Sequence, residues 1–232
     1  MSVIVLIPAA GQGRRMGTAV SKQYLNLAGR PVLAHTLALF DSHPLIDAIY
    51  LLAPAADCAD CRRQIVERYG FVKVRAVVAG GAERQQSVAN GLKACAAAAD
   101  DIILVHDGVR PFFPAELLAE IIATAREVGG CVVGVPVKDT IKTVVAGRIA
   151  GTPERSQLWQ AQTPQAFPFA VLQRAYAAAE REGFRGTDDA SLVERLGLPV
   201  AMLAGSDRNI KITTPEDLQL ARAFCCDDEV ER

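Results

Sequence analysis

Short runs of apolar residues alternate with amphipathic segments along most of this chain. Runs typical of strands cover residues 3–8, 47–53, 72–79, 101–106, 131–137 and 200–203. Apolar positions recur at helical spacing in residues 31–40, 57–69, 83–99, 114–128, 167–182, 190–196 and 215–224. This order predicts an α/β fold with a single Rossmann-like, mostly parallel twisted sheet that is flanked by helices.

Residues 131–163 interrupt the alternation. A second strand-like run at 141–145 follows the first, and a polar stretch at 147–157 separates it from a third run at 159–163. Because no amphipathic helix fits this stretch, we expect residues 138–163 to form a β arm that protrudes from the sheet.

Length and composition narrow the class of protein. A chain of 232 residues, half of them apolar, is long enough for one domain over residues 1–232 with a core of its own. A formal net charge of −1 excludes a general nucleic-acid binder, and the apolar content excludes disorder. The apolar run at 3–10 is too short to cross a bilayer, and no Lys or Arg precedes it as in a secretory signal. We therefore expect a cytoplasmic protein without a membrane partner.

Positive charge gathers near the beginning of the chain. The first 40 residues carry a net charge of +4 and no acid, whereas the remaining 192 carry −5. Within this region the first predicted strand leads into a turn with Gly11 and Gly13, followed by Arg14, Arg15 and Lys22. Backbone N–H groups of such a turn can hold phosphate oxygens, and unopposed cations neutralise a polyphosphate. The pattern favours a triphosphate site over a turn with solvated arginines.

Two common phosphate-binding motifs do not fit this turn. A dinucleotide site requires a third glycine where Met16 stands, and an acid after the second strand, which ends in Ala53 and Pro54. A P-loop requires Gly-Lys-Ser/Thr five places after its first glycine, and this chain has none there. Both a nicotinamide-dependent oxidoreductase and a P-loop enzyme are therefore disfavoured.

Six cysteines add little to the functional interpretation. Cys58 and Cys61 form a lone CxxC, and neither a second CxxC nor a spaced pair of histidines completes a set of zinc ligands. We interpret the pair as structural, three residues apart on one helix.

Eight motifs, in order, make the chain resemble the 2-C-methyl-D-erythritol 4-phosphate cytidylyltransferase family of the non-mevalonate isoprenoid pathway. They are PAAGxGxRM at 8–16, KQYL at 22–25, GGxERxxSV at 80–88, VHDxxRP at 105–111, PVxDT at 136–140, LWxAxTPQ at 158–165, TDxAS at 187–191 and NIKxTxPEDL at 209–218. The resemblance covers essentially the whole chain and implies the nucleotidyltransferase type of α/β fold. The chain departs from the family at Arg208, where an acid or a small residue is common, which leaves the role of Asp207 open.

The resemblance implies a reaction in which CMP passes from CTP to the phosphate of methylerythritol phosphate and pyrophosphate leaves. The attacking oxygen is already anionic, so the reaction needs positioning and charge stabilisation rather than a general base. Mg²⁺ is the implied cofactor, carried mainly by the CTP phosphates, with Asp107 as a candidate carboxylate near it.

The resemblance also assigns residues to roles. The implied catalytic cations are Arg15, Lys22, Arg155 and Lys211. The implied nucleotide contacts are Ala9, Ala10, Gly11, Gly13, Gly81, Arg84, Ser87 and Asp107. The implied acceptor contacts are Asp107, Arg110, Thr140, Arg155, Thr163, Thr187 and Lys211. For three of these, other interpretations remain open: Ser87 as a first-turn hydroxyl, Arg110 as a structural ion pair and Asp107 as a cap.

In the family, the arm clasps a second subunit and brings Thr140 and Arg155 into the neighbour's acceptor site, which implies a homodimer. Two further functions remain open at this point. A cytidylyltransferase for another polyol phosphate, such as ribitol 5-phosphate, would share the nucleotide motifs. A non-catalytic nucleotide sensor could share the fold, although it would not need cations directed at a transition state.

Overall fold

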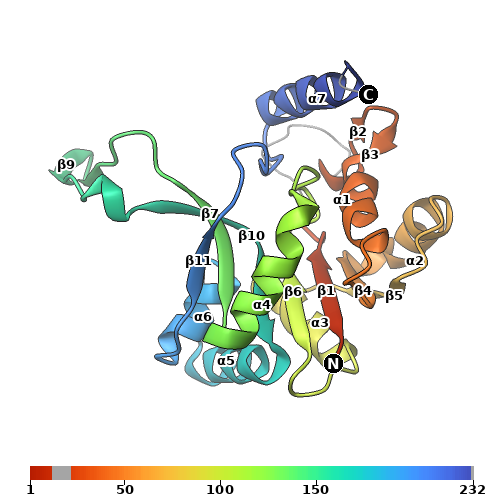
Figure 1. Ribbon diagram of the computed structural model, residues 1–232, viewed down its shortest axis with the longest axis horizontal. Helices are drawn as coiled ribbons and strands as arrows, with labels where there is room; N and C mark the ends of the chain where they lie inside the picture. Colours follow the sequence, from red (N-terminus) through yellow and green to blue (C-terminus); the bar gives the residue numbers. More distant parts are fainter. Residues whose placement is uncertain (12–21, 231–232) are drawn as a thin grey trace.

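A seven-stranded sheet with helices on both faces forms the body of the computed structural model (Figure 1). The structure describes residues 1–11 and 22–230, with side chains for 1–11 and 23–226. The strands of this sheet are β1 (Val3–Pro8), β4 (Ala48–Ala53), β5 (Val74–Ala79), β6 (Ile102–Val105), β7 (Cys131–Pro136), β10 (Trp159–Pro168) and β11 (Ala201–Ala204). They lie in the order β11-β7-β10-β6-β1-β4-β5. All neighbouring pairs are parallel except those of β10, which runs antiparallel to β6 and β7. The expected mostly parallel α/β sheet is confirmed.

With the exception of the last, the helices of the described residues divide between the two faces of the sheet. They are α1 (Val32–Asp41), α2 (Cys58–Cys61), α3 (Arg84–Ala94), α4 (Leu118–Val128), α5 (Phe169–Glu182), α6 (Asp189–Arg195) and α7 (Pro215–Val230). Short helical turns are η2 (Lys22–Tyr24), η3 (Ala55–Asp57), η4 (Arg62–Glu67), η5 (Ala115–Leu117) and η6 (Arg155–Gln157). α2 continues directly into η4, which has π-helical winding, so the helix expected over 57–69 is present with altered winding.

Alternate residues of β1 supply the two cores, as the period of a strand requires. Val5 and Ile7 pack with α1, η4 and α4, whereas Ile4 and Leu6 pack with α3, α5 and α6. A third, smaller core joins α7 to the hairpin of β2 (Asn26–Leu27) and β3 (Arg30–Pro31). β1 is thus buried on both faces, as its continuous apolar run predicts.

Three predicted element boundaries are wrong. The helix expected over 215–224 continues to Val230. Phe167 belongs to β10 rather than to the following helix; because layers pack on both faces of the sheet here, adjacent residues of β10 are buried in opposite cores and the period of two is lost. The helix expected over 83–99 ends at Ala94, and Cys95 adopts an extended conformation. The carboxylate of Asp101 then accepts hydrogen bonds from the N–H groups of Ala98 and Ser2 and holds the alanine-rich segment in a turn.

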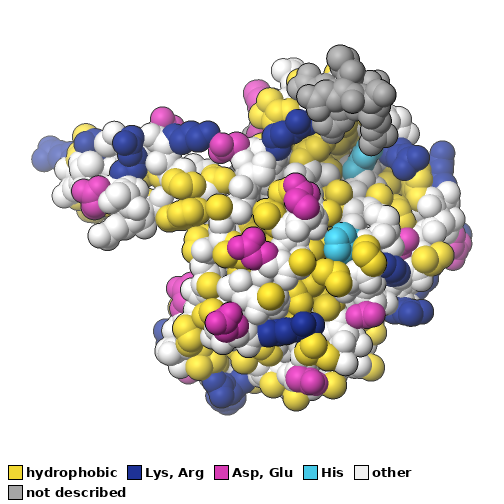
Figure 2. Space-filling view, viewed as in Figure 1, with side chains coloured by type: hydrophobic (Ala, Val, Ile, Leu, Met, Phe, Trp, Pro, Cys, Tyr) yellow, Lys and Arg dark blue, Asp and Glu magenta, His cyan; other side chains and the backbone are white. Residues whose placement is uncertain are grey.

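The arm projects from the body of the molecule (Figure 1). It carries a small hairpin of β8 (Thr143–Val145) and β9 (Arg148–Gly151), followed by η6. The arm is shorter than the expected 138–163, since residues 159–161 already pair with β7 in the central sheet. Lys and Arg side chains are prominent along it (Figure 2).

Candidate active site

Three loops meet at the carboxyl ends of the central strands. They follow β1, β5 and β6. β4 and β5 lie on one side of β1 in the sheet and β6 lies on the other, so the strand order reverses at β1. Ligands of open α/β sheets bind at such a switch point. The loops enclose a pocket of about 150 Å³, lined by Pro8, Ala9, Ala10, Gly11, Gln23, Gly81, Ala82, Glu83, Arg84, Ser87, Asp107, Val109 and Lys211.

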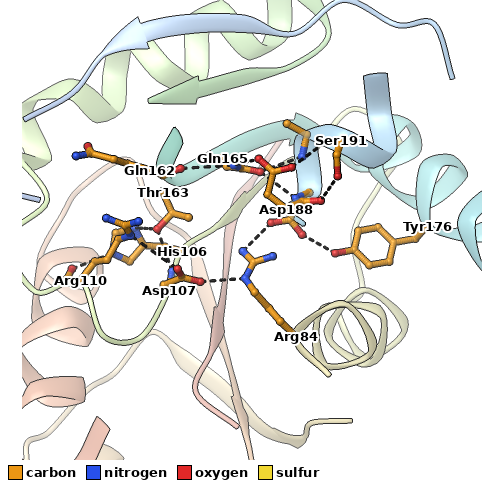
Figure 3. A network of polar contacts seen from close by, with 12 residues as sticks. Arg84, His106, Asp107, Arg110, Gln162, Thr163, Gln165, Tyr176, Asp188 and Ser191 are labelled. Carbon is orange, nitrogen blue, oxygen red and sulfur yellow. Dashed lines mark hydrogen bonds and ion pairs between the residues drawn. The ribbon is translucent and has the colours of Figure 1, made fainter. Parts of the chain in front are cut away.

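Three cations converge on the carboxylate of Asp107, which lines this pocket; Figure 3 shows two of them, Arg84 and Arg110. Arg84 Nε lies 3.0 Å from Oδ1, Lys211 Nζ lies 2.8 Å from Oδ2, and Arg110 Nε lies 3.7 Å from Oδ2. The side chain of Asp107 is only 8 % exposed, whereas Lys211 is 39 % exposed. Arg84 also pairs with the buried Asp189, so the three cations face two acids and one positive charge remains in excess, which suits an anionic ligand.

Burial and charge act in opposite directions on this cluster. Burial alone would raise the pKa of Asp107, but Arg84, Lys211 and Arg110 outweigh it and hold that pKa far below its ordinary value. Burial lowers the pKa of Arg110, and its ion pair with Asp107 only partly opposes this. Asp107 is consequently an anion at every physiological pH.

Arg84 is held from two sides (Figure 3). Besides Asp107, its Nη2 donates to Asp189 Oδ2 at 2.7 Å, and the side chain of Asp189 is fully buried. Tyr176 donates to the other oxygen of Asp189 at 2.5 Å. Burial alone would lower the pKa of Arg84, yet the two carboxylates raise it well above its usual value. The arrangement fixes the guanidinium at the wall of the pocket.

Close packing shapes the loop after β5. A Cβ on Gly80 would lie 2.6 Å from Ala10 Cβ and 2.8 Å from Ser87 Oγ, so only glycine fits there. Ser87 Oγ accepts from the N–H of Gly81 at 3.0 Å and donates to the carbonyl of Glu83. Ser87 thus holds the first turn of α3 and also lines the pocket, so its contact with the nucleotide stays a prediction.

The structure brings most of the expected nucleotide residues together. The same pocket is lined by Ala9, Ala10, Gly11, Gly81, Arg84, Ser87 and Asp107. Lys211, which was expected among the catalytic and acceptor residues, lines it too. Gly13 and Arg15 lie outside the described residues, as does the side chain of Lys22, whose backbone begins η2 beside the pocket residue Gln23.

The expected acceptor residues are more dispersed. Five of them are not among the described residues that line the pocket: Thr140, Arg155, Thr187, Arg110 and Thr163. Thr140 and Arg155 are exposed on the arm, and Thr187 is exposed in the loop before α6.

Arg110 and Thr163 instead contact Asp107, which lines the pocket. Arg110 Nη1 donates to the carbonyl of Asn209 at 2.6 Å, which agrees with the interpretation of Arg110 as a structural ion pair. Thr163 is buried, and its hydroxyl contacts the backbone N–H of Asp107 and the ring of His106. Its hydroxyl therefore has protein partners rather than an open path to a substrate.

Other contacts fix the base of the arm. Arg155 Nη1 donates to the carbonyl of Lys138 at 2.8 Å, and Lys138 Nζ lies 2.6 Å from Asp207 Oδ2. Asp207 thus contacts the arm of its own chain, although the residue that follows it is Arg208.

Sequence reasoning missed Gln23, Tyr176 and Asp189. Gln23 lies in the KQYL motif at 22–25, immediately after Lys22, and that motif could have marked it as a site residue. Asp189 occupies an unspecified position between Asp188 and Ala190, and no sequence pattern marks Tyr176 as its partner.

The described residues offer no all-protein metal site. They contain no group of three or more His, Cys, Asp or Glu side chains placed to hold a metal ion. Both oxygens of Asp107 already face cations. No disulfide joins any cysteines of the described residues. Burial raises the pKa of Cys58 and raises that of Cys61 to about 11, which does not favour redox chemistry at the CxxC.

The mostly parallel sheet and the small cationic pocket at its switch point, lined by residues that follow β1, indicate a nucleotidyltransferase of the α/β class. The family profile described as 2-C-methyl-D-erythritol 4-phosphate cytidylyltransferase (IspD) matches residues 3–226. The chain belongs to this family.

Individual relatives agree with the family match. A protein of this name from Syntrophotalea carbinolica is 61% identical over 224 residues, which cover 97% of this chain and 96% of that protein. Another from Geotalea uraniireducens is 56% identical over 225 residues, covering 97% of each chain. The crystal structure of the Thermus thermophilus enzyme superposes with a TM-score of 0.78 at 36% identity, covering 97% of this chain and 99% of that one. The structure of 4-diphosphocytidyl-2C-methyl-D-erythritol synthase from Anaerococcus prevotii gives 0.84 at 33% identity, covering 97% and 96%.

Membership makes this chain a CTP-dependent cytidylyltransferase that acts on 2-C-methyl-D-erythritol 4-phosphate in the isoprenoid pathway. This function supersedes the ribitol phosphate, oxidoreductase and sensor alternatives. No helix within residues 1–11 and 22–230 is long and apolar enough to cross a membrane.

Proposed function

We propose that the transfer occurs by a single in-line displacement at the α-phosphorus of CTP. A phosphate oxygen of methylerythritol phosphate forms the new P–O bond. The bond from the α-phosphorus to the bridging oxygen breaks, and pyrophosphate leaves with the electron pair. No proton has to move in this reaction. One observation carries the proposal: Arg84, Arg110 and Lys211 converge on Asp107, which stays ionised. The cluster supplies fixed charge and geometry, which such a reaction requires.

The loop after β1 and the loop after β5 form the nucleotide side of this site. Ala9, Ala10 and Gly11 contribute little side-chain bulk to the pocket, and Gly81 lines it from the other loop. We propose that their backbone groups read the edge of a pyrimidine. Arg84, clamped between two carboxylates, can face the nucleotide without losing side-chain entropy on binding.

Cations act where charge accumulates. We assign Arg15 and Lys22, with Gly13 in the same turn, to the triphosphate and to the transition state at the α-phosphorus. Lys211 is the most exposed cation of the Asp107 cluster and can reach both the nucleotide and the acceptor phosphate. Arg155, Thr140 and Thr187 complete the acceptor site.

Mg²⁺ is proposed to arrive on the phosphates of CTP. Because both oxygens of Asp107 have cationic partners, the described residues provide no ready ligand set of their own. A metal held by the triphosphate would neutralise phosphate charge and keep several of its waters. We assign no chemical step to it.

A homodimer would complete the acceptor site. Ile141, Val144, Val145 and Ile149 are exposed on the arm, and apolar side chains gathered in this way favour a protein partner. In one protomer Thr140 and Arg155 lie on this arm and do not line the pocket. We propose that each arm enters the partner's active site, and that the dimer works in the cytoplasm, where CTP is available.

The configuration at phosphorus tests the displacement. One diastereomer of α-thio-CTP is converted with methylerythritol phosphate, and the configuration of the thio-product is determined by ³¹P NMR after conversion to a reference compound. A single displacement inverts the configuration at phosphorus. Retention would demonstrate a covalent cytidylyl-enzyme and would overturn the proposed mechanism.

A further inference from the structure

His106 occupies an unusual place for a polar ring. It is fully buried at the end of β6, with its ring centroid 4.9 Å from that of Phe40 and 5.7 Å from that of Phe113. These contacts form an aromatic cluster in which an apolar ring would pack equally well. Burial of a polar ring costs free energy unless hydrogen bonds compensate it. The contacts of both ring nitrogens therefore indicate why a histidine stands here.

Each nitrogen of His106 has one partner, and together they fix the tautomer. Nε2 lies 3.0 Å from the carbonyl oxygen of Arg110, which can only accept, so Nε2 carries the proton. Burial lowers the pKa of His106 to about 4, so the ring is neutral at pH 7 and Nδ1 is an acceptor. Nδ1 lies 3.2 Å from the hydroxyl of Thr163, which therefore donates to it.

The same hydroxyl completes a chain of hydrogen bonds that ends at Asp107. Thr163 Oγ1 accepts from the backbone N–H of Asp107 at 3.1 Å. The chain thus runs from the Asp107 amide through Thr163 and His106 to the Arg110 carbonyl, and it ties the two ends of the turn 107–110 to β10 (Figure 3). The N–H of Arg110 also donates to the carbonyl of Asp107 at 3.1 Å, which closes the turn. The orientation of the Asp107 carboxylate depends on this turn.

We infer that His106 and Thr163 are positioning residues that aim the carboxylate of Asp107 at Arg84 and Lys211. Neither is among the described residues that line the pocket, so both act only through the turn. Thr163 thereby has a role different from the acceptor contact that the family resemblance implies. The inference rests on the proposed role of Asp107 in organising the cationic cluster.

Four variants separate this role from simple packing. His106→Phe keeps an aromatic ring between Phe40 and Phe113 but removes both hydrogen bonds. Thr163→Val keeps the shape and removes the hydroxyl, whereas Thr163→Ser retains it. Thr36→Val is a matched control, since Thr36 has a buried hydroxyl that donates to the carbonyl of Gly108 in the same turn but does not contact Asp107.

For His106→Phe and Thr163→Val we expect kcat to fall by about 10- to 100-fold, the effect of a misplaced group in a preorganised site. Thermal unfolding should show that both proteins are folded. Thr163→Ser should restore kcat to within about threefold. Thr36→Val removes a hydrogen bond from the middle of the turn but leaves both of its ends held, so it should lower kcat by less than about threefold. Long-range ¹H–¹⁵N NMR spectra of the wild type should show the Nε2–H tautomer of His106 at pH 7.

Several outcomes would overturn the inference. They are wild-type kcat in Thr163→Val, no rescue by Thr163→Ser, an equal loss in Thr36→Val, or an Nδ1–H tautomer. Asp107→Asn distinguishes this failure from that of the proposed function: full activity in that variant would remove Asp107 itself from the mechanism. A loss in Asp107→Asn with normal kinetics in Thr163→Val would leave Asp107 in place and refute only the positioning role.

Discussion

Arg84 and Asp189 lie 105 residues apart in the chain, yet Nη2 of the arginine is 2.7 Å from Oδ2 of the aspartate. Arg84 begins α3 beside the pocket, and Asp189 begins α6. The backbone N–H of Asp189 in turn donates to the side chain of Gln165 in β10. The pair thus joins the nucleotide loop to two elements from the second half of the chain.

Replacing Asp189 should weaken both folding and CTP binding. Asp189→Asn leaves Arg84 with Asp107 alone, and removal of one partner of a buried ion pair costs about 3 kcal/mol of unfolding free energy. We expect the KM for CTP to rise about tenfold, the loss associated with one charge-assisted hydrogen bond. Tyr176→Phe is the control, since it removes a hydrogen bond to Asp189 but leaves the ion pair. A normal KM for CTP in Asp189→Asn would show that the pair is purely structural.

Lys22 is expected to act on the transition state more than on bound CTP. Lys22→Ala should lower kcat by about 10²- to 10³-fold, as does removal of one group that stabilises developing charge. Binding of CTP, measured by calorimetry in the absence of the acceptor, should change far less. Near-normal turnover would remove Lys22 from the catalytic residues, and Arg15→Ala provides the parallel case.

Lys211 should give the opposite kinetic signature. It is the exposed member of the Asp107 cluster, and we assign it to the acceptor phosphate. Lys211→Ala should raise the KM for methylerythritol phosphate by about tenfold or more, with CTP affinity retained. Because Lys211 also lines the pocket formed by the nucleotide motifs, a collapse of CTP affinity instead would assign it to the nucleotide side.

The buried His106 makes stability depend on pH. Its pKa is about 4 in the folded protein and about 6.5 in the unfolded chain, so between these values the unfolded state binds more protons. The unfolding free energy should therefore fall as the pH drops from about 6.5 to 4, by about 3 kcal/mol from this group alone. Asp107 and Arg110 are the charged neighbours, and Asp107 stays ionised throughout this range.

Urea unfolding of the wild type and of His106→Phe at several pH values isolates this contribution. Groups common to both proteins cancel when the unfolding free energy of the variant is subtracted from that of the wild type. This difference should become less favourable to the wild type as the pH falls from about 6.5 to 4. A difference independent of pH would mean that His106 titrates normally in the folded protein.

The sequence predicted the fold and the nucleotide loops well because both depend on local patterns. Continuous apolar runs marked β1 and β6, and small residues after β1 marked the pocket. The start of α5 was not predictable in this way, since Phe167 lies in a strand covered by layers on both faces and a buried run has no diagnostic period.

The supporting residues of the site could not be predicted for a different reason. Asp189 and Thr163 act through contacts with residues 105 and 56 positions away, and no spacing rule reports such contacts. The motif around Thr163 indicated that the residue matters but not which way its hydroxyl is directed. From that direction we infer that Thr163 supports Asp107.

Mixed dimers provide the test of a shared active site. Lys22→Ala and Arg155→Ala chains, each inactive alone, are unfolded together and refolded at equal concentrations. If the arm of one protomer completes the partner's site, one site of each mixed dimer carries both lesions and the other carries neither. Random pairing of a two-fold symmetric dimer makes about half of the dimers mixed, so about a quarter of all sites should be intact.

Activity should accordingly recover to about one quarter of the wild-type value at equal total protein. Each variant refolded alone is the control, and differently tagged chains verify by tandem affinity capture that mixed dimers are present. If Lys22 and Arg155 of the same chain share a site, every site in a mixed dimer carries one lesion and no activity returns. That result, with mixed dimers demonstrated, would place Arg155 in its own protomer's site or outside the active site, because only an exchanged arm separates the two lesions.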